Sequence, residues 1–359
     1  MSKVSRAVER ALELDVVGRH DDAIDQLAKA SQEGDAEAMT QLAKRIIVGD
    51  RAPRLVQQGI AILNDAVQLG SAEAAERLAV IFASGIAGTP DWQAVLRLLV
   101  LAAERGWTPA YQQLSVLASM TSMEQDRPQQ ETAVDSAPRS PASYLRDIDL
   151  RTLLLPPEGS VVNSDPLIRH FPAFLNKRVC EWLIDWARSR LTRALVYDVA
   201  SQSAVTDGSR TNSYAVFNNM ETDLVHLMVQ TRISLACGHP ISHMETSTVL
   251  HYAVGEEFGN HYDFVDPEKP GYAEEVRRSG HRIITFLIYL NADYQGGETV
   301  FPKLGLSLRG QAGDGMYFVN ALENMQADVR TLHNGQAPTS GEKWVFSQFI
   351  RDRRPALSC

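Results

Sequence analysis

Three side chains in the second half of the chain have the types and spacing of metal ligands. His261 and Asp263 are two positions apart, and on an extended strand such residues project to the same face, so both can reach one ion. His333, on an expected late strand just before the turn residues Asn334 and Gly335, is the third candidate. Two histidines and one carboxylate form the facial triad that non-haem Fe(II) oxygenases use. The sequence therefore predicts that these three residues bind iron and serve catalysis.

The incomplete ligand set is itself part of the prediction. Three protein ligands leave three positions open on an octahedral ion, enough for a 2-oxo acid to occupy two and O₂ to occupy the third. The pair His261 and Asp263 alone would be weak support, because exposed or internally satisfied histidines and aspartates at that spacing are commoner than ligands. The interpretation depends on His333 converging on them.

Lys343 falls ten positions after His333 (343 − 333 = 10), on the next expected strand, with Val345, Ser347 and Phe349 continuing its face. A lysine ammonium is a compact cation that can hold the distal carboxylate of 2-oxoglutarate. An inward lysine among apolar neighbours requires an anion. The alternative is a lysine at a strand end whose ammonium reaches solvent.

The segments around these residues resemble the prolyl 4-hydroxylase family of Fe(II)- and 2-oxoglutarate-dependent dioxygenases. The resemblance spans about residues 166–352, in order and at compatible spacing. It rests on Arg210-Thr211-Asn212-Ser213, Glu245, Tyr252-x-x-Gly255-x-x-Phe258-x-x-His261-x-Asp263, Arg282-x-x-Thr285-x-x-x-Tyr289-Leu290-Asn291, Gly296-Gly297-Glu298-Thr299-x-Phe301-Pro302, Phe318-x-Asn320, His333-x-Gly335 and Gly341-x-Lys343-Trp344. Three positions depart from the family pattern: Phe258, where tyrosine is common, Phe349, where tryptophan is common, and Asn212, where the family has serine.

This resemblance implies a double-stranded β-helix (jelly-roll) fold with iron ligation by His261, Asp263 and His333. It also implies that Lys343 binds the distal carboxylate of 2-oxoglutarate, aided by the Tyr252 hydroxyl and by a hydrogen bond from Thr285. L-Ascorbate is the reductant that family members use to restore oxidised iron.

The first third of the chain repeats with a fixed period. Gly34, Gly70 and Gly106 are 36 residues apart (70 − 34 = 36; 106 − 70 = 36), and several apolar positions share the interval, among them Leu27, Leu63 and Leu99, and Ala38, Ala74 and Ala110. Apolar residues at helical spacing on both sides of each glycine predict a helix hairpin in every unit. The pattern resembles the Sel-like repeats, relatives of the tetratricopeptide repeats, and predicts a short solenoid. Such a solenoid either binds a partner protein or only stabilises the enzyme.

Composition divides the chain into three parts. Residues 1–118 form the expected helical repeat domain, the polar and proline-bearing residues 119–143 form a linker, and residues 144–359 form the dioxygenase domain with a core at about 246–352. Residues 173–191 predict one amphipathic helix. Beyond residue 195, short β-branched and aromatic stretches between turns predict many strands, namely Ser247–Tyr252, Arg282–Leu290, Gly315–Asn320, Val329–His333 and Lys343–Ile350. The predicted fold class is therefore α+β multidomain: a helical solenoid followed by a jelly roll.

The bulk properties exclude several classes of protein. A formal net charge of -9 argues against a nucleic-acid-coating protein, and no apolar run reaches the roughly 20 residues of a membrane span. Three cysteines do not make a disulfide framework, so a cytoplasmic location is expected. The predicted activity is hydroxylation of a C–H bond in a protein, peptide or small-molecule substrate, with succinate and CO₂ as co-products. The alternatives are a free amino acid or small-metabolite hydroxylase, and a non-catalytic repeat scaffold or oxygen sensor.

Overall fold

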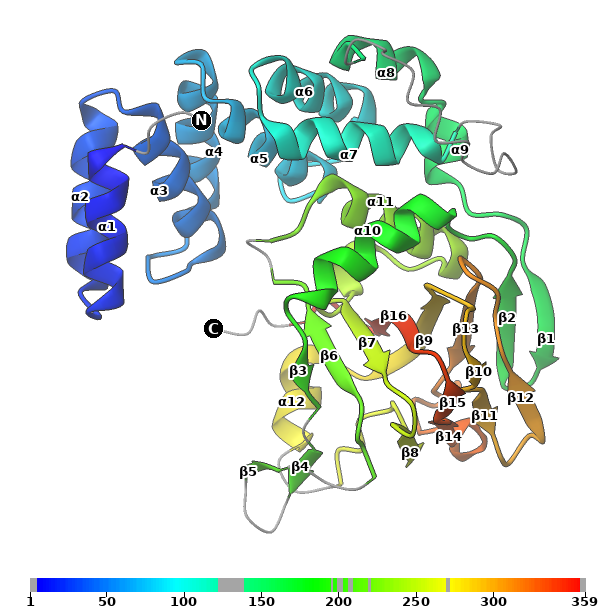
Figure 1. The fold of residues 1–359 in the computed structure, drawn as a ribbon. Coiled ribbons are helices and arrows are strands. Elements are labelled where there is room, and N and C mark those ends of the chain that lie inside the picture. The colour runs from blue at the N-terminus through cyan, green and yellow to red at the C-terminus, as the bar shows by residue number, and fades with distance from the viewer. Residues whose placement is uncertain are drawn as a thin grey trace. The chain divides into compact units, whose positions relative to one another are not determined.

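The computed structural model describes residues 5–121, 139–194, 196–198, 203–205, 209–218, 221–268 and 272–355. It divides into two compact units (Figure 1). The helical unit comprises Met1–Leu153 and Asn219–Leu227, and the sheet unit comprises Leu154–Asn218 and Met228–Ser358. The described residues contain no helix long and apolar enough to cross a lipid bilayer.

The helical unit consists of paired helices. Its helices are α1 (Arg6–Val16), α2 (His20–Gln32), α3 (Ala36–Val48), α4 (Val56–Gln68), α5 (Ala72–Ala83), α6 (Trp92–Glu104), α7 (Thr108–Ser119), α8 (Pro141–Asp147) and α9 (Leu150–Leu154, which ends at the boundary with the sheet unit). The predicted hairpins are confirmed as the pairs α2/α3, α4/α5 and α6/α7, and α1 adds a helix before the first of them.

The period of the sequence is visible in the backbone of these hairpins. Gly34, Gly70 and Gly106 have φ angles of 87°, 98° and 85°, a left-handed conformation that glycine adopts without steric penalty. Asp35 and Ser71 follow two of these glycines and cap the next helix, because their side-chain oxygens accept hydrogen bonds from its first backbone N–H groups.

The inner faces of the hairpins are closely packed. Leu27, Leu63 and Leu99 are completely buried, which contributes about 1.5–3 kcal/mol for each side chain. The alanines of the repeat, Ala38, Ala74 and Ala110, are also fully buried and allow the paired helices to approach closely. The repeat predicted from spacing is therefore the core of this unit.

Two differences from the expected domain limits follow from packing. Residues 144–153, expected to begin the dioxygenase domain, belong to the helical unit, because α8 packs against α6 and α7 and Tyr144 meets Tyr111 edge to face. The segment Asn219–Leu227 also belongs there, since the Gln113 side chain accepts a hydrogen bond from the backbone of Leu224 at 2.9 Å. Of the expected linker, residues 122–138 lie outside the described residues.

The sheet unit is built from antiparallel strands. They are β1 (Ser160–Ser164), β2 (Leu167–Phe171), β3 (Thr192–Arg193), β4 (Val196–Asp198), β5 (Ser203–Val205), β6 (Ser213–Val216), β7 (Thr248–Tyr252), β8 (Phe258–His261), β9 (Arg282–Tyr289), β10 (Gln295–Gly296), β11 (Thr299–Phe301), β12 (Leu306–Leu308), β13 (Gly315–Val319), β14 (His333–Gly335), β15 (Pro338–Ser340) and β16 (Lys343–Arg351). An eight-stranded sheet has the order β1-β2-β13-β9-β16-β7-β6-β3, and a four-stranded sheet has the order β12-β11-β14-β8. The predicted fold class, helical repeats followed by an antiparallel sheet domain, is confirmed.

Aromatic side chains fill part of the interior between these two sheets. Phe301 from β11 meets Phe318 from β13 edge to face, with ring centroids 5.0 Å apart, and both side chains are completely buried. Strand β9 is buried on both faces, because every residue from Ile284 to Tyr289 is buried. Its neighbours β13 and β16 flank it in the centre of the larger sheet.

Helices cover the outer face of the larger sheet. The expected helix over 173–191 is α10 (Lys177–Arg188), and its Trp186 stacks on Phe217 next to β6. Helix α11 (Leu224–Cys237) begins in the helical unit and continues in the sheet unit, where Gln230 donates a hydrogen bond to Gln348 of β16. Two short 3₁₀ turns, η1 (Ile241–His243) and η2 (Val329–Thr331), and helix α12 (Tyr272–Ser279) complete the unit.

One expected strand is wrong. Residues Val329–Thr331 form η2, and only His333 onward is extended, as β14. The turn forms because the Asp328 side chain accepts a hydrogen bond from the backbone N–H of Arg330, while the Arg330 guanidinium pairs with Asp328 and Asp165.

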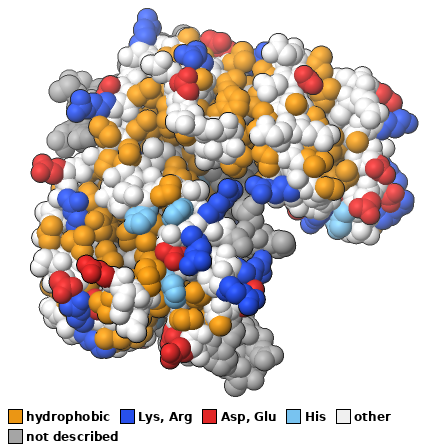
Figure 2. Space-filling model, turned by 180° about the vertical axis from the view of Figure 1, so that it is seen from behind, with side chains coloured by type: hydrophobic (Ala, Val, Ile, Leu, Met, Phe, Trp, Pro, Cys, Tyr) orange, Lys and Arg blue, Asp and Glu red, His pale blue; other side chains and the backbone are white. Residues whose placement is uncertain are grey.

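Charged side chains of both signs share the surface. On the face drawn in Figure 2, acidic and basic side chains occur side by side on each part of the chain.

Candidate active site

The three predicted metal ligands come together in the sheet unit. His261 ends β8, Asp263 follows two residues later, and His333 begins β14, where it lies directly opposite His261 in the antiparallel pair. One ligand atom from each residue lies within 4.8 Å of the other two. Only His261 is strictly on the β8 strand, so the shared face comes from the strand end and the turn after it.

Backbone hydrogen bonds orient both imidazoles. The Nδ1–H of His261 donates to the carbonyl of Gly259 at 2.8 Å, and the Nδ1–H of His333 donates to the carbonyl of Thr331 at 3.0 Å. Because Nδ1 carries the proton in each ring, Nε2 presents its lone pair. These Nε2 atoms lie 3.5 Å and 3.4 Å from the two carboxylate oxygens of Asp263.

The electrostatics suit a divalent cation. Burial lowers the pKa of His333 to about 4, so the ring is neutral at physiological pH and able to bind a metal. Burial alone would raise the pKa of Asp263, but His333, His261 and a hydrogen bond from Thr285 together hold it below its usual range. The result is an ionised carboxylate beside the neutral imidazole of His333 and the Nε2 of His261, the donor set that Fe(II) binds in facial triads.

Ring stacking fixes the outer side of this site. Phe258 stacks on His261 with centroids 3.5 Å apart and an interplanar angle of 6°, and the Arg210 guanidinium lies 4.3 Å above the Phe258 ring. On the inner side, Phe318 and Phe301 approach His333 at 4.8 Å and 5.5 Å between centroids. The ligand histidines are therefore held by packing on both sides.

Lys343 and Tyr252 form a second group in the same interior. They are directly opposite each other in the pair β16/β7, and the Lys343 ammonium lies 5.0 Å from the centre of the Tyr252 ring. Lys343 is only 2% exposed, and burial lowers its pKa to about 8 against the opposing effect of Glu298. Among the described residues, no carboxylate forms an ion pair with this ammonium.

A buried ammonium without a counter-ion is unfavourable, so this pocket fits a ligand carboxylate. The backbone is shaped around the lysine: a Cβ on Gly297, whose φ is 71°, would lie 3.3 Å from Lys343 Cδ. The Tyr252 hydroxyl lies near the His333 strand, since a Cβ on Gly335 would be 3.3 Å from it. Burial also raises the pKa of Tyr252, so its phenol stays protonated and can donate.

Thr285 has a different partner from the one expected. Its hydroxyl donates to Asp263 Oδ2 at 2.7 Å and accepts a hydrogen bond from the Asn320 side chain at 2.8 Å. A hydroxyl has one proton, so Thr285 has no donor left for 2-oxoglutarate. Thr285 does face the interior, but its hydroxyl forms a hydrogen bond with the metal ligand Asp263 and not with 2-oxoglutarate.

Sequence reasoning assigned no role to two further residues of this interior, Tyr289 and Asn320. Tyr289 lies with its ring centre 6.0 Å from the Lys343 ammonium, and its hydroxyl contacts the Thr299 hydroxyl at 3.0 Å. Asn320 is completely buried beside Thr285. The sequence could have indicated Tyr289, because alternation along β9 places residues 285, 287 and 289 on one face. The partner of Asn320 depends on the register of β13 against β9, which the sequence alone does not give.

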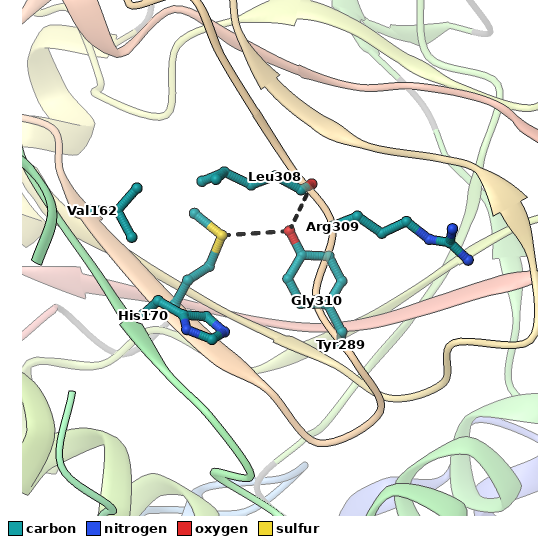
Figure 3. A pocket seen from close by; sticks show the side chains of 7 residues that line it. Val162, His170, Tyr289, Leu308, Arg309 and Gly310 are labelled. Atoms are coloured by element: carbon teal, nitrogen blue, oxygen red, sulfur yellow. Dashed lines mark hydrogen bonds between the residues drawn. The ribbon is translucent and has the colours of Figure 1, made fainter. Parts of the chain in front are cut away.

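A separate cavity of about 220 Å³ is bordered by Tyr289 (Figure 3). It is lined by Val162, His170, Tyr289, Leu308, Arg309, Gly310 and Met316, and includes none of the predicted metal ligands. The Arg309 guanidinium points away from the cavity (Figure 3). It donates hydrogen bonds to the backbone carbonyls of Ala292 and Tyr294. The cavity is therefore mainly apolar and distinct from the site of the three ligands.

Comparison with known proteins decides the family. Residues 247–351 match the family model of the 2OG-Fe(II) oxygenase superfamily. A probable prolyl 4-hydroxylase 9 of Arabidopsis thaliana is 31% identical over 210 residues, which cover 54% of this chain and 71% of that protein. The chain belongs to the prolyl 4-hydroxylase family of 2OG-Fe(II) oxygenases.

Several other proteins are similar to parts of this chain. Prolyl 4-hydroxylase 1 of Arabidopsis thaliana is 29% identical over 58% of this chain and 80% of its own length. Among solved structures, a viral collagen prolyl hydroxylase of Paramecium Bursaria Chlorella virus-1 covers 51% of this chain and 95% of its own, with a TM-score of 0.40 and 23% identity. A Sel1 repeat protein from Oxalobacter formigenes covers 39% of this chain and 55% of its own, with a TM-score of 0.29 and 19% identity.

The oxygenase is therefore a 2-oxoglutarate-dependent dioxygenase, and its cofactor and cosubstrate are Fe(II) and 2-oxoglutarate. The residues present fit both groups. The Nε2 atoms of the two histidines and the ionised carboxylate of Asp263 match the iron, and the buried ammonium of Lys343 matches a dicarboxylate.

Proposed function

We propose that this oxygenase hydroxylates a carbon–hydrogen bond of a peptidyl substrate, with a prolyl residue as the first candidate. One atom of O₂ becomes the new hydroxyl group, and the other enters the succinate that forms as 2-oxoglutarate loses CO₂. The observation that carries the proposal is the convergence of His261, Asp263 and His333 in the same interior as the buried, unpaired Lys343. The names of the prolyl 4-hydroxylase relatives support the prolyl residue.

Different residues would bind the iron and the 2-oxoglutarate. His261, Asp263 and His333 would hold the iron, which when bound supplies the activation of O₂ and the attack on the C–H bond. Lys343 and the Tyr252 hydroxyl would bind the distal carboxylate of 2-oxoglutarate and thereby fix its orientation. The completely buried rings of Phe301 and Phe318 exclude water from the inner side of His333. We also propose L-ascorbate as the reductant that restores Fe(II).

Asn212 bears on the substrate. It stands where the family has serine, and it is completely buried, with its side chain accepting a hydrogen bond from Arg210 and donating one to the carbonyl of Ser213. These contacts hold the loop and engage both the oxygen and the N–H of the side-chain amide. The difference from the family therefore changes the interior of the loop, and a peptide substrate remains compatible with it.

The test uses the full chain with Fe(II), 2-oxoglutarate, ascorbate and air, and compares proline-containing peptides with free amino acids. Succinate is measured by NMR and oxygen incorporation by mass spectrometry. The proposal expects succinate and a one-oxygen mass increase in at least one peptide, both lost in Lys343→Met. Turnover confined to a free amino acid would overturn the peptidyl assignment, and the absence of succinate with every substrate would overturn the activity.

A further inference from the structure

The carboxylate of Asp263 has both oxygens directed toward the other ligands. Its Oδ1 lies 3.5 Å from Nε2 of His261, and its Oδ2 lies 3.4 Å from Nε2 of His333. An ion bound by the two imidazoles is therefore within reach of either oxygen or of both. The choice matters, because a carboxylate that binds through both oxygens occupies two coordination positions.

A buried hydrogen-bond chain ends on one of these oxygens. The Thr285 hydroxyl donates to Oδ2 at 2.7 Å, and the Asn320 side-chain N–H donates to the Thr285 oxygen at 2.8 Å. The direction is fixed by chemistry, since an ionised carboxylate only accepts and the hydroxyl has a single proton. Oδ1 has no contact with this hydroxyl among the described hydrogen bonds.

Asn320 is placed to hold this chain rigidly. It is completely buried at the end of β13, its backbone N–H donates to Ile283 at 2.8 Å, and its carbonyl accepts from Asp328 at 2.9 Å. Among the residues that the structure describes, its side-chain Oδ1 has no hydrogen-bond partner, an unfavourable state for a buried acceptor. An apolar side chain would avoid that penalty, so the amide is explained by what its N–H does for Thr285.

We propose that Asn320 and Thr285 are positioning residues that keep Asp263 a one-oxygen ligand. The Thr285 hydroxyl, which donates a hydrogen bond to Oδ2, competes with the metal for that oxygen and leaves Oδ1 for the ion. Two imidazoles and one oxygen leave three positions of an octahedral ion open, two for 2-oxoglutarate and one for O₂. A second carboxylate oxygen would remove one of them. This inference rests on the proposed iron ligation.

The test separates metal binding from cosubstrate binding in the full chain under anaerobic conditions. Metal affinity is measured by Co(II) titration, whose visible spectrum also reports coordination number. The affinity for 2-oxoglutarate is measured in the Fe(II) form from its visible charge-transfer band. Thr285→Val keeps the shape of the side chain and removes the hydroxyl, whereas Thr285→Ser keeps the hydroxyl and is the matched control.

Thr285→Val is expected to bind metal at least as tightly as the wild type and 2-oxoglutarate about ten-fold more weakly, as for the loss of one hydrogen bond to a charged group. Thr285→Ser should restore the wild-type affinity for 2-oxoglutarate. Asn320→Leu should weaken 2-oxoglutarate binding less than Thr285→Val does, and should have no further effect when added to it.

An unchanged affinity for 2-oxoglutarate in Thr285→Val would overturn the inference. So would a parallel loss of both affinities that Thr285→Ser did not restore, because that result indicates a purely structural role. Should Thr285→Val fail to fold, Thr285→Ser and Asn320→Leu still give the comparison. If the wild type itself bound neither metal nor 2-oxoglutarate, the proposed function would fall instead.

Discussion

Replacing Lys343 with methionine should make the ligand-free protein more stable while it abolishes cosubstrate binding. The lysine is 2% exposed, and burial lowers its pKa from its usual 10.5 to about 8. That difference corresponds to about 3 kcal/mol of preference for the neutral form. Methionine has a similar length and no charge, so Lys343→Met should remove this penalty.

The stability advantage of Lys343→Met should decrease as pH rises. Between pH 8 and 10.5 the unfolded chain holds the Lys343 proton more tightly than the folded chain, so folding becomes more favourable as pH rises. The advantage of Lys343→Met should therefore be about 3 kcal/mol at pH 7 and about 2 kcal/mol at pH 9. With metal present in all samples, adding 2-oxoglutarate should reverse the order at pH 7, because a ligand at about 1,000 times its Kd stabilises the wild type by about 4.1 kcal/mol and does not stabilise a variant that cannot bind it.

The assay is equilibrium urea unfolding of the full chain at pH 7 and pH 9, followed by circular dichroism and tryptophan fluorescence, with and without ligand. Lys177→Met is the control, since the Lys177 side chain is 83% exposed. It should change stability little at either pH. A Lys343→Met protein less stable than the wild type at pH 7, or equally stabilised by 2-oxoglutarate, would refute the reasoning about a buried cation awaiting a dicarboxylate.

Three further outcomes are expected. The wild-type affinity for 2-oxoglutarate should fall as pH rises above about 8, because the free Lys343 ammonium loses its proton there; calorimetric titration across pH 7 to 9.5 measures this, and a flat profile would argue against the assignment. Gly297→Ala should destabilise the protein by about 1–2 kcal/mol and weaken 2-oxoglutarate binding, since its φ is 71° and its new Cβ would lie 2.9 Å from the Tyr294 ring and 3.3 Å from Lys343 Cδ; unfolding and calorimetry check both effects, and unaltered binding would contradict the contact with Lys343. Glu245→Gln should cost about 3 kcal/mol in urea unfolding, because it leaves the half-buried Arg282 and the buried Arg351 without their shared carboxylate, and a loss near zero would show that the pair is dispensable.

Residue type and spacing indicated the three residues that converge, because the constraint on two of them is local. His261 at the end of β8 and Asp263 in the turn after it reach the same side, and His333 lies opposite His261 on β14. The same reasoning placed Thr285 on the interior face. It could not supply the partner of Thr285, because that depends on β13 lying beside β9 in a register that puts Asn320 next to its hydroxyl.

The repeat was predictable for a related reason. Gly34, Gly70 and Gly106 each end a helix in the left-handed conformation, and one interval fixes all three hairpins. The limits of the helical unit were harder to predict from the sequence. The Gln113 side chain that anchors the backbone of Leu224 belongs to a repeat helix, yet its partner is 111 residues away in the sequence. No periodic pattern encodes such a contact.

The most direct test of the central claim is iron-edge anomalous diffraction from anaerobic crystals of the full chain containing Fe(II) and 2-oxoglutarate. The account predicts a single strong peak bonded to Nε2 of His261, Nε2 of His333 and one oxygen of Asp263, with the distal carboxylate of 2-oxoglutarate at the Lys343 ammonium. Iron bound at another place, or a distal carboxylate directed away from Lys343, would contradict it.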